Sequence, residues 1–134
     1  MKTKLLTLSL IMTGVLLAGF KIGKLRDPWP VPDKYVKMAN PVKSDAESMK
    51  TGKAVWAKHC QSCHGKSGAG DGPKAAQLKT EAGNFTTADF QKQTDGAIFY
   101  KTSEGRDDMP GFKKKIPDTD EIWSVIHYIR TMKK

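Results

Sequence analysis

Two stretches of the chain carry apolar residues at the spacing of an amphipathic helix, and both start with residues typical of a helix cap. The first should begin at Ser44, whose hydroxyl can accept an early backbone N–H while Glu47 reaches back to the cap. Its apolar positions are Ala46, Met49, Val55, Trp56 and Cys60. Gly52 interrupts this face and predicts a place where a second helix can cross closely.

The second stretch ends the chain. Pro117 stops what precedes it, and Asp118 with Glu121 forms another capping box. The apolar stripe of this helix is Ile122, Val125, Ile126, Ile129 and Met132. Two shorter helices are predicted near residues 87–91 and 95–102, and no stretch alternates as a strand would. The pattern therefore predicts an all-α fold.

The N-terminal segment has the pattern of a secretory signal. Lys2 and Lys4 precede an uncharged, mostly apolar run over residues 5–20. No A-x-A-like cleavage site follows, and the run is shorter than the roughly 20 residues that a membrane span prefers. Residues 1–20 are therefore expected to be a signal peptide or an uncleaved membrane anchor. Either would place the rest of the chain in the periplasm or on the exported side of the cell envelope.

The next segment, residues 21–43, contains four of the seven prolines. Alternating prolines hold the backbone extended and resist helix formation, so this segment is interpreted as a linker. Trp29 and Tyr35 leave open that it lies against another part of the protein. The folded domain is then expected over residues 44–134.

The charge is spread along the chain. The formal charge is +9, with nine Lys and Arg against four Asp and Glu in residues 1–50, and fourteen against ten in residues 51–134. A nucleic-acid-binding protein would gather basic residues with interleaved aromatic ones on one face. We therefore expect no nucleic acid among the partners.

The two cysteines of the chain lie in one motif. Residues 60–64 read Cys-Gln-Ser-Cys-His, the C-x-x-C-H signature by which one c-type haem is attached covalently. Cys60 and Cys63 would each bond a vinyl group of the porphyrin, and His64 would be the proximal ligand of the iron.

Three other interpretations of the motif are weaker. A thioredoxin-type pair is expected near a βαβ pattern, which is not visible here. A structural zinc site needs about four ligands, and His59 and His127 do not supply a second pair. A disulfide between Cys60 and Cys63 would close a very short loop and stabilise little.

The sixth iron position has one favoured candidate, Met109. It lies in a stretch, residues 106–112, without helical or strand periodicity, directly before Pro110 and Gly111. A thioether ligand favours the ferrous state and raises the reduction potential. The alternative is that Met109 only packs in its loop. His127 lies outside the main apolar stripe of the last helix and is expected to be partly exposed.

Several of these segments together resemble class I monohaem cytochrome c over roughly residues 46–133. The resemblance is carried by residues 60–65, Gly70-Asp71-Gly72-Pro73, Met109-Pro110-Gly111-Phe112 and residues 122–130. It implies a small helical fold around one haem, with the first and last helices crossing. It also implies that a backbone carbonyl near Pro73 holds the free nitrogen of His64.

The segment from Pro30 to Val42, with Asn40-Pro41-Val42, is also similar to the membrane-attached monohaem cytochrome of bacterial alternative complex III. The lipoprotein cysteine usual in that protein is missing here.

The expected activity is one-electron transfer rather than enzymatic catalysis. Redox partner proteins would be a quinol-oxidising complex, a terminal oxidase or a reductase. Lys113, Lys114 and Lys115 follow the Met109 loop and would steer acidic partners, or form an ordinary solvated charge run. Two alternatives remain: a fixed, membrane-attached haem subunit of a respiratory complex, and a haem enzyme or gas sensor if Met109 does not bind iron.

Overall fold

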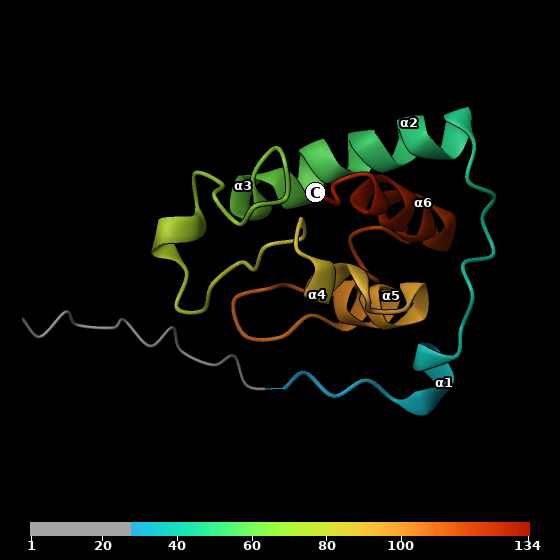
Figure 1. Cartoon of the computed structure of the whole chain (residues 1–134), viewed down its shortest axis with the longest axis horizontal. Helices are drawn as coiled ribbons and strands as arrows, with labels where there is room; N and C mark the ends of the chain where they lie inside the picture. Colours follow the sequence, from blue (N-terminus) through green and yellow to red (C-terminus); the bar gives the residue numbers. More distant parts are fainter. Residues whose placement is uncertain (1–27) are drawn as a thin grey trace, which may run out of the picture.

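Two helices that lie far apart in the sequence cross in close contact at the centre of the structure. The computed structural model describes residues 28–134, so the predicted signal peptide or anchor lies outside the described residues. Helix α2 (Ala46–Val55) packs across α6 (Thr119–Arg130) (Figure 1). A methyl group on Gly52 would overlap the backbone carbonyl of Ser124, so only glycine lets the helices approach this closely. The predicted crossing at Gly52 is confirmed.

Helix α2 begins one residue later than predicted. Its N-cap is Asp45, whose carboxylate accepts the backbone N–H groups of Glu47 and Ser48. The Ser48 hydroxyl accepts the Asp45 N–H at 3.0 Å, which completes a capping box. The predicted box of Ser44 with Glu47 was wrong, because the carboxylate of the next residue reaches the free amides instead.

Helix α6 begins as predicted after Asp118. The Asp118 carboxylate accepts the N–H of Asp120 at 2.9 Å, while the N–H of Glu121 bonds to the Asp118 carbonyl. Asp118 is therefore the N-cap, although it does not use Glu121 in the predicted way.

The core lies between α2, α6 and the segments that follow them. The predicted stripe of α6 is buried, and Met132 lies in the core just beyond the end of that helix. Met49 was expected in the core but is only half-buried. The buried apolar residues are Val55, Trp56, Ile98, Phe112, Ile116, Ile122, Trp123, Val125, Ile126, Ile129 and Met132.

A second layer lies against α6 and consists of α5 (Asp95–Glu104), preceded by the single turn α4 (Ala88–Gln91) (Figure 1). Both short helices were predicted, and α5 runs two residues further than expected. Arg130 ties the layers together, because its guanidinium donates to the Asp95 carboxylate at 2.9 Å and to the Gln91 carbonyl at 3.0 Å.

The described part of the chain is helical. Its only β-type pairing is an isolated bridge between Arg106 and Met109, which confirms the all-α prediction. None of the helices within residues 28–134 has both the length and the apolar character needed to cross a membrane.

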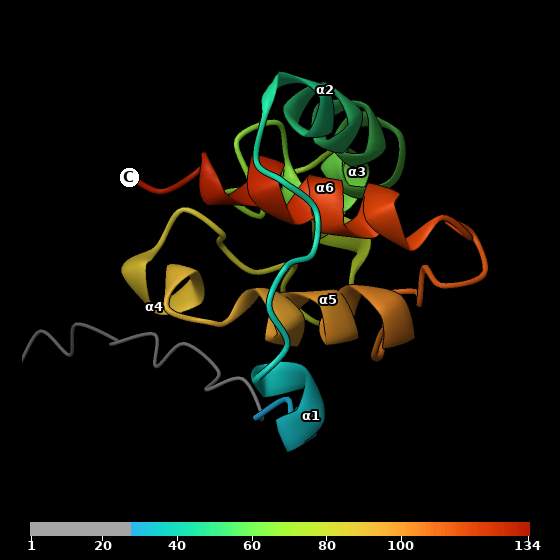
Figure 2. The ribbon, with the colours of Figure 1, turned by 90° about the vertical axis from the view of Figure 1, so that its right-hand side faces the viewer.

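The proline-rich segment lies on the helices. Residues 28–43, here called the N-terminal strap, pass α1 (Asp33–Val36) and run across α5 and α6 to the start of α2 (Figure 2). Asn40 donates to the Trp123 carbonyl at 3.1 Å, and His127 Nε2 lies 2.8 Å from the Val42 carbonyl oxygen. The strap therefore packs on the domain, while a domain boundary at residue 44 stays a prediction.

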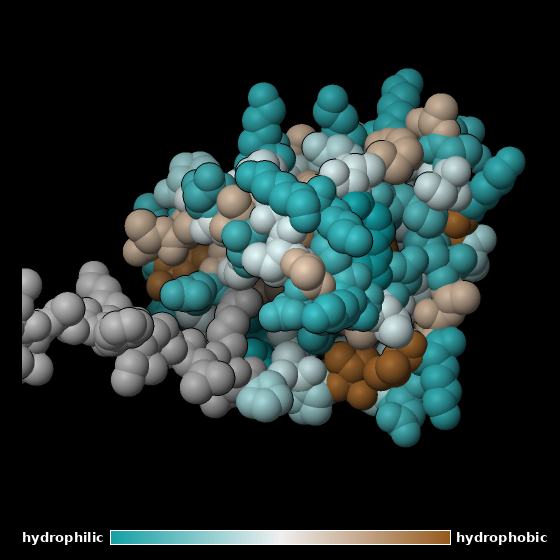
Figure 3. Space-filling view, viewed as in Figure 1, coloured by the Kyte–Doolittle hydropathy of each residue, from teal (hydrophilic) through white to brown (hydrophobic). Residues whose placement is uncertain are grey.

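The surface seen in Figure 3 is mostly hydrophilic, with brown atoms grouped where α1 lies in Figure 1. Val36 of α1 and the nearby Met38 are the large apolar residues that are most exposed in the described part, at 39% and 37%. They bury little on the domain, so the strap is held at other positions.

Candidate haem site

The C-x-x-C-H motif lies where α2 changes its winding. A π-helical turn, η1 (Trp56–Cys60), follows α2 directly and leads into α3 (Gln61–His64). π-Turns are rare and are frequent at functional sites. Cys60, Cys63 and His64 are thus carried on one continuous helical run that starts at the α2–α6 crossing.

Both thiols of the motif are free and half-buried. Burial, together with the neighbouring Cys63, raises the pKa of the Cys60 thiol to about 12. The unmodified Cys60 is therefore a neutral thiol at physiological pH. A neutral, half-buried thiol is a poor metal-binding thiolate, which disfavours a zinc site.

The loop after the motif folds back along α3. The backbone N–H groups of residues 70, 72 and 74 donate to the carbonyls of His64, Cys63 and Ser62 at 2.9, 3.2 and 2.8 Å. These bonds satisfy carbonyl groups that the C-terminal end of a helix leaves open. The Gly72–Pro73 segment therefore lies against the motif, while the bond from its carbonyl to His64 stays a prediction.

The turn into this loop requires glycine. Gly65 has a φ of +81°, and a side chain there would also overlap the Asp71 carboxylate. This explains why the motif is followed by Gly65 and Gly70-Asp71-Gly72.

Aromatic rings surround the imidazole of His64, which is buried. The Phe85 ring centroid lies 4.5 Å from it and the Trp56 centroid 5.9 Å. Trp56 is 1% exposed and donates its indole N–H to the Gly65 carbonyl at 3.2 Å, while Phe90 stacks on Phe85 at 4.1 Å. His64 thus has an apolar, rigid surrounding.

Six aromatic residues were candidates for a haem pocket, and the structure separates them. Trp56 and Phe85 lie beside His64, with Phe90 behind Phe85. The others lie elsewhere: Phe99 stacks on Trp123, Tyr100 contacts Tyr35 and Phe112 contacts His59.

Met109 ends a tight turn after α5. Arg106 and Met109 exchange two backbone hydrogen bonds of 2.9 Å each, and Asp107 between them has a φ of 52°. The Met109 side chain is partly buried against the same core that Cys60 contacts. We call residues 106–109 the Met109 turn.

The Met109 turn is tied to a second loop by Asp108. Its carboxylate accepts the backbone N–H groups of Lys79 and Thr80 at 2.6 and 3.0 Å. Nothing in the local sequence pointed to this role of Asp108, because the partners lie almost thirty residues away.

The competing ligand candidates are engaged elsewhere. His127 is half-buried, as predicted, and contacts the strap carbonyl of Val42. His59 packs edge-on against Phe112, and burial lowers its pKa. Met132 lies in the core.

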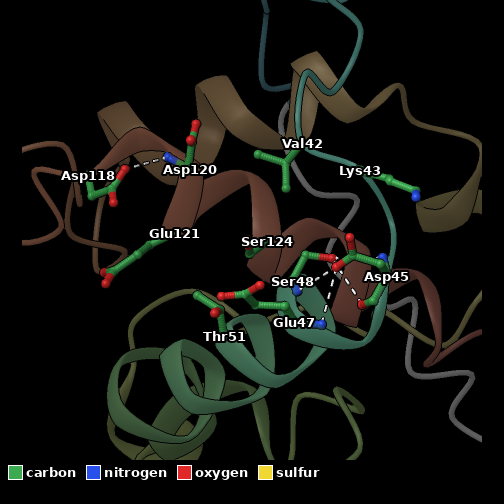
Figure 4. Close-up of a pocket in the computed structure, with 10 residues that line it drawn as sticks. All are labelled: Val42, Lys43, Asp45, Glu47, Ser48, Thr51, Asp118, Asp120, Glu121 and Ser124. Carbon is green, nitrogen blue, oxygen red and sulfur yellow. Dashed lines mark hydrogen bonds between the residues drawn. The ribbon is translucent and has the colours of Figure 1, made fainter.

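A groove of about 380 Å³ lies away from the motif, between the N-termini of α2 and α6 (Figure 4). Five carboxylates line it: Asp45, Glu47, Asp118, Asp120 and Glu121. Asp45 and Asp118 are the helix caps described above, and acidic groups at helix N-termini are favoured by the helix dipole. The acidity of the groove follows from helix capping.

The residues present fit a covalently attached haem. Two free thiols and a buried imidazole lie on one helical run, and a thioether lies on a turn packed against the same core. A zinc centre is not supported, because residues 28–134 contain no group of three or more His, Cys, Asp or Glu placed to hold a metal ion. The motif residues are brought together, whereas Met109 as their axial counterpart stays a prediction.

Comparisons with known proteins point the same way. The family described as "Cytochrome C oxidase, cbb3-type, subunit III" matches residues 47–129. None of the curated proteins matches this chain. Two solved structures are similar, and both are described below with the share of each chain that is covered.

The first is in the Kuenenia stuttgartiensis reducing HAO-like protein complex Kustc0457/Kustc0458, with a TM-score of 0.64 and 27% identity. The match covers 81% of this chain and 52% of that one, so this chain spans about half the length of that neighbour. The second is the KustC0563 c-type cytochrome, with a TM-score of 0.54, 28% identity, and coverage of 62% of this chain and 98% of that one.

Proposed function

Because the chain belongs to the family of cbb3-type cytochrome c oxidase subunit III and is a class I monohaem cytochrome c, we propose that His64 and Met109 are the axial ligands of its haem. The haem c is covalent, through Cys60 and Cys63, and electron transfer follows from the family. The observation that supports the ligand pair is the Met109 turn. It holds a partly buried thioether on closed, doubly hydrogen-bonded backbone against the core that Cys60 also contacts.

The protein residues have three tasks in this proposal. Trp56 and Phe85 keep water from the imidazole of His64. The loop of residues 70–74 fixes the end of α3 and so the position of that imidazole. The Met109 turn holds the thioether in one place, so little must move when the redox state changes. When bound, the haem supplies the one-electron chemistry.

A second function is favoured by one observation, the extent of the match to the HAO-like complex. Residues 47–134 make up only about two thirds of the chain, so a match over 81% must include part of the N-terminal strap. A haem subunit fixed in a larger redox complex therefore stands beside a freely diffusing carrier. In either case, we place the domain on the exported side of the cell envelope, where haem c is attached, with redox proteins as partners.

The test is the optical spectrum of the reduced holoprotein with and without carbon monoxide, for the wild type and two variants. Wild type should be low-spin and slow to bind CO. Met109→Ala should bind CO at once, because the sixth position is open. Met38→Ala removes an exposed methionine and should behave as wild type. Prompt CO binding by the wild type would favour a haem enzyme or gas sensor instead.

Copurification with membrane complexes would distinguish the fixed subunit from the free carrier. A stoichiometric complex that resists salt washing is expected for a subunit. Recovery of the holoprotein alone would favour the carrier.

A further inference from the structure

The beginning of the N-terminal strap contacts the turn that carries Met109. The Arg106 guanidinium lies 4.7 Å from the centre of the Trp29 ring, and the Lys101 ammonium lies 5.7 Å from it. Arg106 also donates to the Pro28 carbonyl at 3.0 Å. Trp29 is half-buried, and two cations on one indole are a favourable cation–π arrangement.

Arg106 transmits this contact directly to Met109. The two residues exchange both of their backbone hydrogen bonds, so they form one closed ring of backbone. The turn cannot open at Met109 without moving Arg106. Any contact that holds Arg106 therefore also holds the Met109 backbone.

The strap is anchored on the rigid helices behind Trp29. The Tyr35 and Tyr100 rings lie 4.8 Å apart, and a side chain at Gly96 of α5 would overlap the Tyr35 carbonyl. Further along, Asn40 bonds to the Trp123 carbonyl on α6. Trp29 thus connects the Met109 turn to a segment fixed on both layers of the fold.

The strap lies outside the family match, which begins at residue 47. It is an addition to the haem domain, and the contacts above show that it reaches one particular loop of that domain. A plain spacer between an anchor and a domain would not need these contacts.

We propose that Trp29 is a positioning residue for the sixth ligand: the strap clamps the Met109 turn through Arg106 and slows the departure of the thioether from the iron. This inference rests on the proposed ligation by Met109. The strap would therefore couple the N-terminal attachment of the protein to the stability of its redox centre.

The experiment uses the full-length holoprotein and imidazole as a competing ligand of the ferric iron. Trp29→Ala should bind imidazole about tenfold faster than wild type and weaken the sulfur-to-iron charge-transfer band. Trp29→Phe keeps an aromatic face and should return the rate to within about threefold of wild type. Asn40→Ala loosens the strap away from the turn and should leave the imidazole rate unchanged.

Each outcome decides the proposal. Equal imidazole rates for Trp29→Ala and wild type, with the charge-transfer band intact, would overturn the clamp while leaving Met109 ligation in place. Faster binding in Asn40→Ala of the same size as in Trp29→Ala would also overturn it, because the effect would then be general loosening. A wild type without the band, unaffected by Met109→Ala, would overturn both the clamp and the proposed ligands.

Discussion

The attachment motif and the Met109 turn differ in what holds them. The motif extends from α2, and Trp56 at its start is 1% exposed and packed in the core. The Met109 turn is held by its own two backbone bonds and by polar contacts of Asp108 and Arg106 at its partly exposed edge.

This difference has a consequence for dynamics. Buried packing couples the motif to global unfolding, whereas a loop held by a few partly exposed polar contacts can open locally at a lower free energy. We therefore expect the proximal side to be lost only when the protein unfolds. The distal side should exchange its ligand while the fold stays intact.

The largest effect is expected at the crossing that supports the motif. Gly52→Ala places a methyl group into the Ser124 carbonyl and should lower the free energy of unfolding by about 3 kcal/mol. Helix propensity alone predicts the opposite, a gain of about 1 kcal/mol. Urea unfolding of the holoprotein, followed by circular dichroism, measures the change.

Ala54→Gly is the control for this substitution, because residue 54 is an exposed position of the same helix. It should cost about 1 kcal/mol through propensity alone. If Gly52→Ala were neutral or stabilising, the helix crossing would be looser than the structure indicates.

A smaller and local effect is expected at the Met109 turn. Asp108→Asn weakens two charge-assisted bonds to the amides of residues 79 and 80, and should speed imidazole binding about fivefold, or ~1 kcal/mol. The urea midpoint should hardly change. Asp107→Asn is the matched control, since Asn also tolerates the positive φ of that position. Equal rates in the two variants would contradict a special role of the Asp108 carboxylate.

The basic residues beside the turn should act on association and not on ligation. Lys113 is paired with Glu104 at 2.7 Å, so the predicted basic rim is reduced to Lys114 and Lys115. Reversal of both to Glu should slow oxidation by ferricyanide, an anion, about threefold at low ionic strength and less at high salt. The same reversal at Lys50 and Lys53 of α2 is the control. An equal loss there would mean that net charge alone matters.

The smallest effect concerns the cap of α2. The Ser48 backbone N–H lowers the pKa of Asp45 below its usual value of 3.8. A lowered pKa stabilises the fold above the unfolded value and loses this contribution as the pH falls through the folded value. The urea midpoint of Asp45→Asn should therefore approach that of wild type between roughly pH 5 and pH 3. With Glu47→Gln as a control, a constant difference at all pH values would contradict the cap.

Much of the fold could be predicted because its signals are local. The C-x-x-C-H motif needs only five neighbouring residues, and the stripe of α6 and the cap at Asp118 lie within one helix. The small residue at position 52 also indicated the crossing before any partner was known. The motif residues of the site were accessible in the same way.

Other features depended on which segments meet in space. Ser44 and Asp45 are both good capping residues, and only the folded backbone decided between them. Met49 has the spacing of a core residue, but the position of α6 leaves it half-buried.

By itself, then, the sequence determined the haem attachment, the helical class and the crossing, since each follows from local chemistry or periodicity. Only the tertiary structure decided the docking of the strap, the tie of Asp108 and the contact of Trp29 with Arg106. These contacts join residues from 28 to almost 80 positions apart, and no local pattern specifies which groups will meet over such separations. The attachment motif is written in neighbouring residues, whereas the support of the Met109 turn depends on the assembled fold.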